Sequence, residues 1–183
     1  MSTPLDLTFE IVPFADWRAG IAPLWNLEGA ESRIAMAING HGQLRYAGRE
    51  LARRVLFFPI AAAWRGQRVG WTSVYNVSDE ALRVRGIYVL PEMRSQGVGR
   101  RMVEFAEGLW PASFSRTLMY ARASNIERYR RWGFAAVPDH ALRAFELEQT
   151  IDEAGIQLMQ RHRHQAQAGT VLAAGSRARE GAL

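Results

Sequence analysis

The sequence predicts an α+β fold with one mixed, mostly antiparallel central sheet, and two observations lead to this class. Residues 57–90 hold three apolar, β-branched or aromatic runs separated by short polar turns at Arg65–Arg68 and Ser78–Glu80, the pattern of an antiparallel meander. From residue 94 onward a glycine-rich loop, a helix, a strand, a helix and further strands follow in turn. This order of elements gives a mixed sheet with helices packed against it.

The elements before the meander are marked by punctuating residues. Pro13 closes the first strand, and Asp16 is the expected N-cap of the first helix, whose apolar pattern Pro23 interrupts. The elements expected here are a strand at Leu7–Val12, a helix from Asp16 through Trp25, and helices at 30–37 and 43–56.

The later elements have clearer boundaries. Pro59 makes the start of the first meander strand an edge or irregular segment, and Pro111 and Gly133 stop the two helices that follow. The expected elements are strands at Phe57–Trp64, Val69–Val77 and Leu82–Leu90, a helix at Arg100–Leu109, a strand at Thr117–Arg122, a helix at Asn125–Trp132, and strands at Phe134–Val137 and Arg143–Leu147.

The C-terminal part has a different composition and is predicted to be a helix followed by a tail. Residues 150–165 are expected to form one helix, because acidic residues stand near its start and basic residues near its end, which complements the helix dipole. The remainder is mainly Ala, Gly, Arg and Gln, which is typical of a mobile tail. The predicted organisation is one domain over residues 1–149 and a C-terminal helix with a flexible Ala/Gly/Arg tail over 150–183.

Composition excludes several classes of protein. The chain has no cysteine, so disulfides, thiolate catalysis and thiolate metal sites are excluded. No apolar stretch approaches the roughly 20 residues of a membrane span, and residues 1–10 lack a secretory signal pattern, so we expect a cytoplasmic protein without a membrane partner. The histidines do not form a ligand set, since His162 and His164 would lie on different sides of a helix, and no metal is expected.

All 23 basic residues are arginine, and the formal net charge is +5. GC-rich coding explains such a bias without any function. An arginine-rich surface for anions is the alternative, because guanidinium groups bind phosphate and carboxylate in a bidentate manner. The arginines are scattered and no aromatic platform accompanies them, which makes nucleic-acid binding an unfavourable interpretation.

The loop between Val89 and Arg100 carries the clearest functional pattern. A helix N-terminus has unpaired N–H groups and a partial positive charge, and therefore attracts phosphate. Gly97 and Gly99 allow a ligand to approach the backbone, and Arg94 and Arg100 can add charge-assisted hydrogen bonds. A Walker loop is excluded because there is no lysine, and the dinucleotide fingerprint lacks its third glycine. The pattern that remains is R-x-x-G-x-G after V-x-P.

Two motifs in this order resemble the GNAT N-acetyltransferase superfamily. The segment Ile87-Tyr88-Val89-x-Pro91-x-x-Arg94-x-x-Gly97-x-Gly99 is similar to the acyl-coenzyme A loop of that family. The segment Tyr129–Phe134 is similar to its tyrosine-containing helix, which ends in Gly-Phe. The order of strands and helices agrees over residues 7–148. The resemblance implies helices on both faces of the sheet and a pair of strands that splay apart.

The resemblance also implies a cofactor site. The pantetheine arm of coenzyme A lies in the gap beside the splayed strand, and Gly86 breaks the alternation of that strand, which favours a bulge. The backbone contacts to pantetheine and thioester would come from Ile87, Tyr88 and Val89. The pyrophosphate would lie on the loop residues Arg94, Ser95, Gln96, Gly97, Val98, Gly99 and Arg100.

Tyr129 matches the residue that protonates the leaving thiolate in many relatives, a step that suits a nearby phenol. The alternative is an aromatic side chain that packs the helix on the sheet. Relatives often place an asparagine one turn before Asn125, where this chain has Arg122, so Asn125 is carried over loosely as a cofactor contact. The strand segment Leu82–Arg85 has no acid that could act as the general base. Water, a distant carboxylate such as Glu28, Glu31 or Glu92, or an already neutral amine would take its place.

The predicted function is transfer of an acyl group, most simply acetyl from acetyl-coenzyme A, to a primary amine by direct attack in a ternary complex. Two alternatives stay open: a non-catalytic module that binds or senses acyl-coenzyme A, and an acyltransferase for an amine on a peptide or nucleic acid. Arg83, Arg85 and Arg122 suggest an acceptor with a carboxylate or phosphate, although solvated strand-edge charges explain them equally well. The acceptor is expected to be a small molecule or peptide, and a homodimer is possible.

Overall fold

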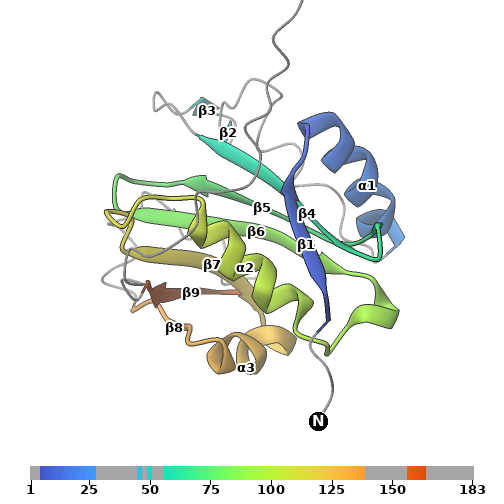
Figure 1. Ribbon diagram of the computed structural model, residues 1–183. Coiled ribbons are helices and arrows are strands. Elements are labelled where there is room, and N and C mark those ends of the chain that lie inside the picture. Colours follow the sequence, from blue (N-terminus) through green and yellow to red (C-terminus); the bar gives the residue numbers. More distant parts are fainter. Residues whose placement is uncertain (1–4, 28–44, 47–48, 51–55, 139–155, 164–183) are drawn as a thin grey trace, which may run out of the picture.

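Seven strands of the computed structural model form one mixed sheet, which confirms the predicted α+β class (Figure 1). The structure describes residues 5–27, 45–46, 49–50, 56–138 and 156–163. The strand order is β1-β4-β5-β6-β7-β9-β8. The strands of this sheet are β1 (Leu7–Ile11), β4 (Phe57–Trp64), β5 (Gln67–Asn76), β6 (Ala81–Val89), β7 (Arg116–Arg122), β8 (Ala135–Ala136) and β9 (Ile156–His162). The helices are α1 (Phe14–Leu27), α2 (Val98–Gly108) and α3 (Ala123–Arg131), with a 3₁₀ turn at Pro91–Met93 before α2.

The predicted splay lies between β6 and β7, the one parallel pair among the described strands. These two strands are in register only from Ala81–Arg116 to Arg83–Leu118. Beyond Arg83, β6 continues to Val89 beside β5 alone, whereas β7 continues beside β9. One edge of the last part of β6 therefore has no neighbour among the described strands.

A β-bulge fixes the direction of β6 after the split. The register of β5 and β6 shifts at Thr72, which faces both Gly86 and Ile87. Gly86 has a φ of 65°, a conformation that glycine adopts without strain. The hydroxyl groups of Thr72 and Ser73 donate to the carbonyl oxygen of Arg85, at 3.0 and 3.3 Å. The bulge that the sequence predicted at Gly86 is thus confirmed, and two side chains hold it.

The helices cover both faces of the sheet, as expected. On one face, Trp17 and Ile21 of α1 pack with Ala61, and the Trp17 indole donates a hydrogen bond to the carbonyl of Thr72 at 2.8 Å. On the other face, Val103 of α2 and Tyr129 of α3 belong to one apolar cluster. The strands can pack apolar side chains on both faces because successive side chains of a strand point to opposite faces. No helix in the described part of the chain is long and apolar enough to cross a membrane.

The predicted C-terminal helix is wrong, because residues 156–162 form strand β9. This strand pairs antiparallel with β7 along its whole length and with β8 on its other edge. Leu158 is buried against one face of the sheet and Met159 against the other. A strand buried on both faces lacks the alternating pattern that marks strands in a sequence. The ladder bonds to two strands outweigh the weak helical propensity of this segment.

Two arginines of the C-terminal segment bind the end of α2. Arg161 donates to both carboxylate oxygens of Glu107, at 3.2 and 2.6 Å, and to the carbonyl of Trp132 at 2.7 Å. The Arg163 guanidinium donates to carbonyl oxygens in the last turn of α2 and in the segment that follows it, where backbone acceptors lack a helical partner. These acceptors are Glu107, Trp110, Pro111 and Phe114, at 2.7 to 3.1 Å.

The helix predicted over 43–56 is also wrong in part, since Arg45–Tyr46 and Arg49–Glu50 pair as a short antiparallel ribbon of β2 and β3. Gly48 stands in the middle of the predicted helix, and a glycine there disfavours helix. Asp16 lies in the first turn of α1 rather than at its N-cap. The predicted helix at 30–37, strand at 143–147 and C-terminal tail lie outside the described residues.

The Arg161–Glu107 pair should contribute substantially to stability, because both side chains are at most 14% exposed. Arg161→Met leaves the Glu107 carboxylate buried without a partner, and we expect the free energy of unfolding to fall by about 3 kcal/mol. The matched control is Arg130→Met, whose pair with Glu127 is exposed and should contribute less than about 0.5 kcal/mol. Urea unfolding measures both values. Equal losses in the two variants would contradict the assigned role of the buried pair.

Candidate active site

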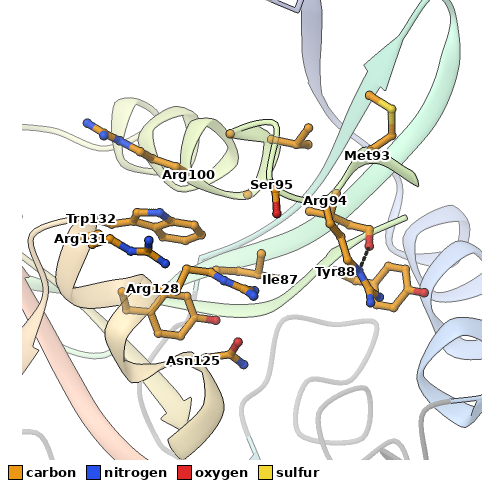
Figure 2. A pocket seen from close by; sticks show the side chains of 15 residues that line it. Ile87, Tyr88, Met93, Arg94, Ser95, Arg100, Asn125, Arg128, Arg131 and Trp132 are labelled. Carbon is orange, nitrogen blue, oxygen red and sulfur yellow. Dashed lines mark hydrogen bonds between the residues drawn. The ribbon is translucent and has the colours of Figure 1, made fainter. Parts of the chain in front are cut away.

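A pocket of about 590 Å³ opens where β6, the loop before α2 and the helix α3 meet (Figure 2). Its volume lies in the range of pockets for cofactors and other small ligands. The lining residues are Ile87, Tyr88, Val89, Met93, Arg94, Ser95, Gly97, Val98, Gly99, Arg100, Asn125, Arg128, Tyr129, Arg131 and Trp132. This set contains every residue that the sequence analysis assigned to the site except Gln96, whose side chain instead donates to the carbonyl of Glu92 at 2.9 Å.

The loop before α2 has the geometry of an anion cradle. Gly97 is the N-cap of α2 and has a φ of 80°, and Ser95 has a φ of 63°. Left-handed residues in such a turn direct successive N–H groups toward one side and form a concave anion site. A Cβ atom on Gly97 would meet nothing within 4 Å. The missing side chain therefore leaves the N-terminal N–H groups of α2 open to the pocket.

The surroundings of Gly99, the second glycine of the motif, differ from those expected. A Cβ atom on Gly99 would lie 3.1 Å from Cη2 of the Trp132 indole and 3.5 Å from Ile87 Cγ2. Gly99 thus lets the indole at the end of α3 pack closely on the first turn of α2. This contact sets the width of the pocket between the two helices, which the motif alone did not indicate.

Four arginines surround the pocket, two more than the motif predicted. Arg94 donates from Nε to the carbonyl of Val89 at 3.0 Å, and Figure 2 shows it across the pocket from Arg128 and Arg131. Arg100 pairs through Nε with Glu104 at 2.8 Å, with both side chains about half exposed. The spacing of Arg128 and Arg131 places both on one side of α3. That spacing, next to Tyr129, is the sequence signal that could have found them.

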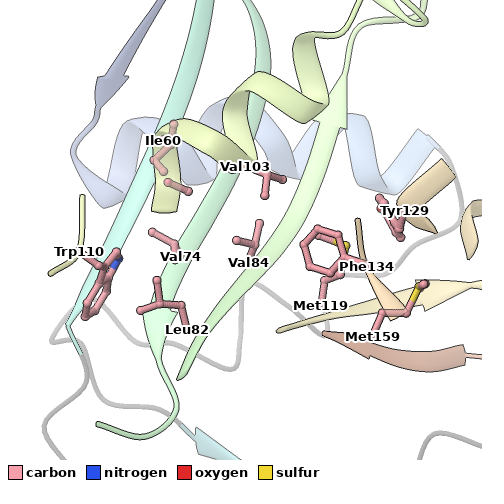
Figure 3. Packing of buried hydrophobic residues seen from close by; sticks show 12 residues of the cluster. Ile60, Val74, Leu82, Val84, Val103, Trp110, Met119, Tyr129, Phe134 and Met159 are labelled. Carbon is pink, nitrogen blue, oxygen red and sulfur yellow. The ribbon is translucent and has the colours of Figure 1, made fainter. Parts of the chain in front are cut away.

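Tyr129 belongs both to the pocket wall and to the apolar core. It is 9% exposed, and its ring centroid lies 5.1 Å from that of Trp132 and 6.4 Å from that of Phe134. Figure 3 shows Tyr129 and Phe134 in the apolar core. Burial raises the pKa of its phenol above the usual value, and Arg128 partly opposes this shift. No described residue hydrogen-bonds its hydroxyl. Tyr129 therefore packs in the core, as the alternative interpretation of the sequence held, and also lines the pocket, as a catalytic role requires.

The rest of the pocket is apolar or weakly polar. Asn125 lies in the first turn of α3 and lines the pocket (Figure 2). Within the described segments, no three histidine, cysteine or acidic side chains come together as metal ligands do. The arrangement joins a cationic cradle for phosphate, an open strand edge and a neutral phenol within one pocket.

Comparisons with known proteins agree with this geometry. Residues 52–136 match the model of the acetyltransferase (GNAT) domain. None of the curated protein sequences matches the chain. Among solved structures, a GNAT-family acetyltransferase of Staphylococcus aureus is similar with a TM-score of 0.60 at 10% identity, over 85% of this chain and 98% of that one. An acetyltransferase of Streptococcus agalactiae has a TM-score of 0.57 at 13% identity, over 86% and 98% of the two chains.

A third structure, of Neisseria gonorrhoeae N-acetylglutamate synthase with coenzyme A and N-acetyl-glutamate, has a TM-score of 0.56 at 13% identity. The likeness spans 90% of this chain and 37% of that longer one. At such identities these structures show a shared fold. The matched domain and the shared fold identify residues 52–136 as an acetyltransferase (GNAT) domain.

Proposed function

We propose that this protein transfers an acetyl group from acetyl-coenzyme A to a primary amine by direct attack in a ternary complex. The observation that carries the proposal is the common location of two groups with separate tasks. The cradle at the start of α2 and the phenol of Tyr129 line the same pocket, on either side of the unpaired edge of β6. A module that only binds coenzyme A would need the cradle but not the phenol.

The cradle suits the phosphate groups of coenzyme A. The N–H groups at the start of α2 and the helix dipole favour negative charge at this position. Arg94, Arg128 and Arg131 line the pocket and supply positive charge. Arg100 forms an exposed pair with Glu104, which contributes little to stability and can be exchanged for a phosphate.

The splayed part of β6 suits the pantetheine arm. From Val84 to Val89 the edge of β6 that faces β7 has no strand partner in the described part of the chain, and the Val89 carbonyl accepts from Arg94. The other N–H and C=O groups on this edge can bind an extended ligand. Ile87, Tyr88 and Val89 line the pocket along this edge. Asn125 adds a polar side chain from α3 on the opposite wall. The thioester would then lie in the gap between β6 and β7.

Tyr129 would act as the general acid. In the reaction the amine nitrogen forms a bond to the acetyl carbon, the carbon–sulfur bond breaks, and the thiolate takes the phenol proton. Because burial raises its pKa, the phenol stays protonated at neutral pH and is always ready to donate. The amine must be neutral to attack, and its proton leaves to solvent, since the described residues around β6 offer no carboxylate at Leu82–Arg85.

Gly97 provides the first test. Gly97→Ala places a methyl group in the open space where the phosphate should lie, and we expect coenzyme A affinity to fall at least tenfold, or about 1.4 kcal/mol. Gly66→Ala is the matched control, because Gly66 also has a positive φ of 77° and open surroundings but lies in the β4–β5 turn. Both variants carry the same backbone strain. Calorimetric titration that finds equal affinities in the two variants would contradict the cradle.

Tyr129 provides the second test. Tyr129→Phe keeps the ring in the core and removes only the donor. The turnover number should fall by about 10²–10⁴, the usual contribution of a general acid, whereas acetyl-coenzyme A affinity should change by less than about threefold. This combination identifies an interaction made only in the transition state. Turnover with an amine found by screening for thiol release, together with a binding titration, measures both quantities.

The pH dependence separates this role from a structural one. The neutral phenol is the donor, and burial, which raises its pKa, keeps it neutral in neutral and mildly basic solution. The ratio of wild-type to Tyr129→Phe turnover should therefore be constant from about pH 7 to about pH 9.5. Near-wild-type turnover in the variant, with chemistry rate-limiting, would remove Tyr129 from the mechanism. So would a ratio that falls toward one by about pH 8.5.

A further inference from the structure

Two arginines on β6 are buried and have no counter-ion among the described residues. Arg83 is only 7% exposed, and Arg85 is partly buried. The Nε atoms of both are buried and have no hydrogen-bond partner. A buried charge is costly unless it is paired. Such groups in a native fold call for an explanation by function.

The surroundings of the two arginines stabilise their positions without neutralising them. The Arg83 guanidinium lies 4.1 Å from the Tyr120 ring and 5.8 Å from the Tyr75 ring. Burial, followed by the neighbouring charge of Arg83, lowers the pKa of Arg85 to about 10. No carboxylate in the described part of the chain pairs with either residue.

Other arginines of this chain, one of them buried, do pair with carboxylates. Arg161 is similarly buried and meets Glu107 in a bidentate contact. Arg116 and Arg68 are far more exposed, and each also meets a glutamate. The two arginines of β6 therefore differ from these in being buried while no carboxylate of the described segments pairs with them.

Arg83 and Arg85 lie where β6 and β7 separate. Arg83 forms the last pair with β7, and Arg85 is the second residue beyond it. Ile87, which lines the acetyl-coenzyme A pocket, lies two residues further, or about 7 Å along the strand. The carbonyl of Arg85 is fixed by the hydroxyls of Thr72 and Ser73. The arginines thus lie at the closed end of the gap that the thioester would enter.

The two sides of the gap have different chemistry. Val84 and Tyr129 pack on the face of α2 and α3. Arg83 and Arg85 alternate with Leu82 and Val84, so their side chains lie on the face of α1. A thioester in the gap would have its proton donor on the first face and two cations on the second. An amine that attacks from the second face would bring its own substituents to the arginines.

We infer that Arg83 and Arg85 bind an anionic group of the acceptor, so that the acceptor is a small primary amine that also carries a carboxylate or phosphate. This inference rests on the proposed function and names its substrate class. The bound anion would supply the charge that the fold omits, and Arg can bind either group in a bidentate manner. Because a buried charge pair forms only with the correct acceptor, neutral amines would be discriminated against.

The test compares three amines of similar size as acceptors: propylamine, β-alanine and 2-aminoethyl phosphate. Thiol release from acetyl-coenzyme A gives kcat/KM for each. In the wild type, at least one anionic amine should exceed propylamine by about 30-fold or more. Comparing kcat/KM for β-alanine with that for 2-aminoethyl phosphate shows which of the two anionic groups is preferred. Arg85→Met and Arg83→Met should lower kcat/KM for the anionic amine to about the value for propylamine, with coenzyme A still bound. Arg130→Met, an exposed arginine of α3 outside the pocket, should behave as wild type.

A second measurement covers the case in which none of these amines is acetylated. With coenzyme A saturating, inorganic phosphate or acetate should raise the melting temperature of the wild type and of Arg130→Met, but not of the two β6 variants. Turnover of neutral amines as fast as anionic ones would overturn the inference and leave the proposed function standing. Anion stabilisation that persists in both β6 variants would also overturn it. Coenzyme A binding without transfer to any amine would instead contradict the proposed function.

Discussion

The early end of the pairing between β6 and β7 is the constraint on which the rest of the structure depends. A strand edge with unpaired N–H and C=O groups is costly when buried and invites a partner. Here the edge begins after Arg83, and the bulge at Gly86, held by Thr72 and Ser73, turns the strand end toward α2. The pocket, the cradle at Gly97 and the buried arginines all take their positions from this split.

A sheet divided in this way needs contacts that hold its two parts together. One part contains β1, β4, β5 and β6, and the other contains β7, β9 and β8. Three of the contacts that join them are made on α2: the bidentate pair of Arg161 with Glu107, the Arg163 guanidinium on the carbonyls at the end of α2, and the Trp132 indole on Gly99. All three involve α2, whose N-terminus forms the cradle. Helix α2 thus carries the binding loop at its start and, at its end, contacts that join the two parts of the sheet.

Much of this organisation could be predicted from the sequence, and what could not has a physical reason. The strands from 57 to 90, the loop and the two motifs have strong local signals, because turn residues and glycines at fixed spacing dictate their backbone. Strand β9 has no such signal, since both faces of it are buried and its stability comes from pairing with β7 and β8. Arg128 and Arg131 were missed because arginines on a helix usually face solvent. The isolation of Arg83 and Arg85 depends on what surrounds them, which only the folded arrangement reveals.

The central claim is that the open edge of β6 binds the acyl-coenzyme A chain. Amide hydrogen exchange measured by NMR, with and without acetyl-coenzyme A, tests it most directly. The account predicts slower exchange both at residues 94–100 of the cradle and along residues 84–89 of β6, with little change in β4 or β9. Protection confined to the cradle, with β6 exchanging as in the free protein, would contradict the claim, because it would mean that the phosphates bind while the split between the strands does not receive the chain.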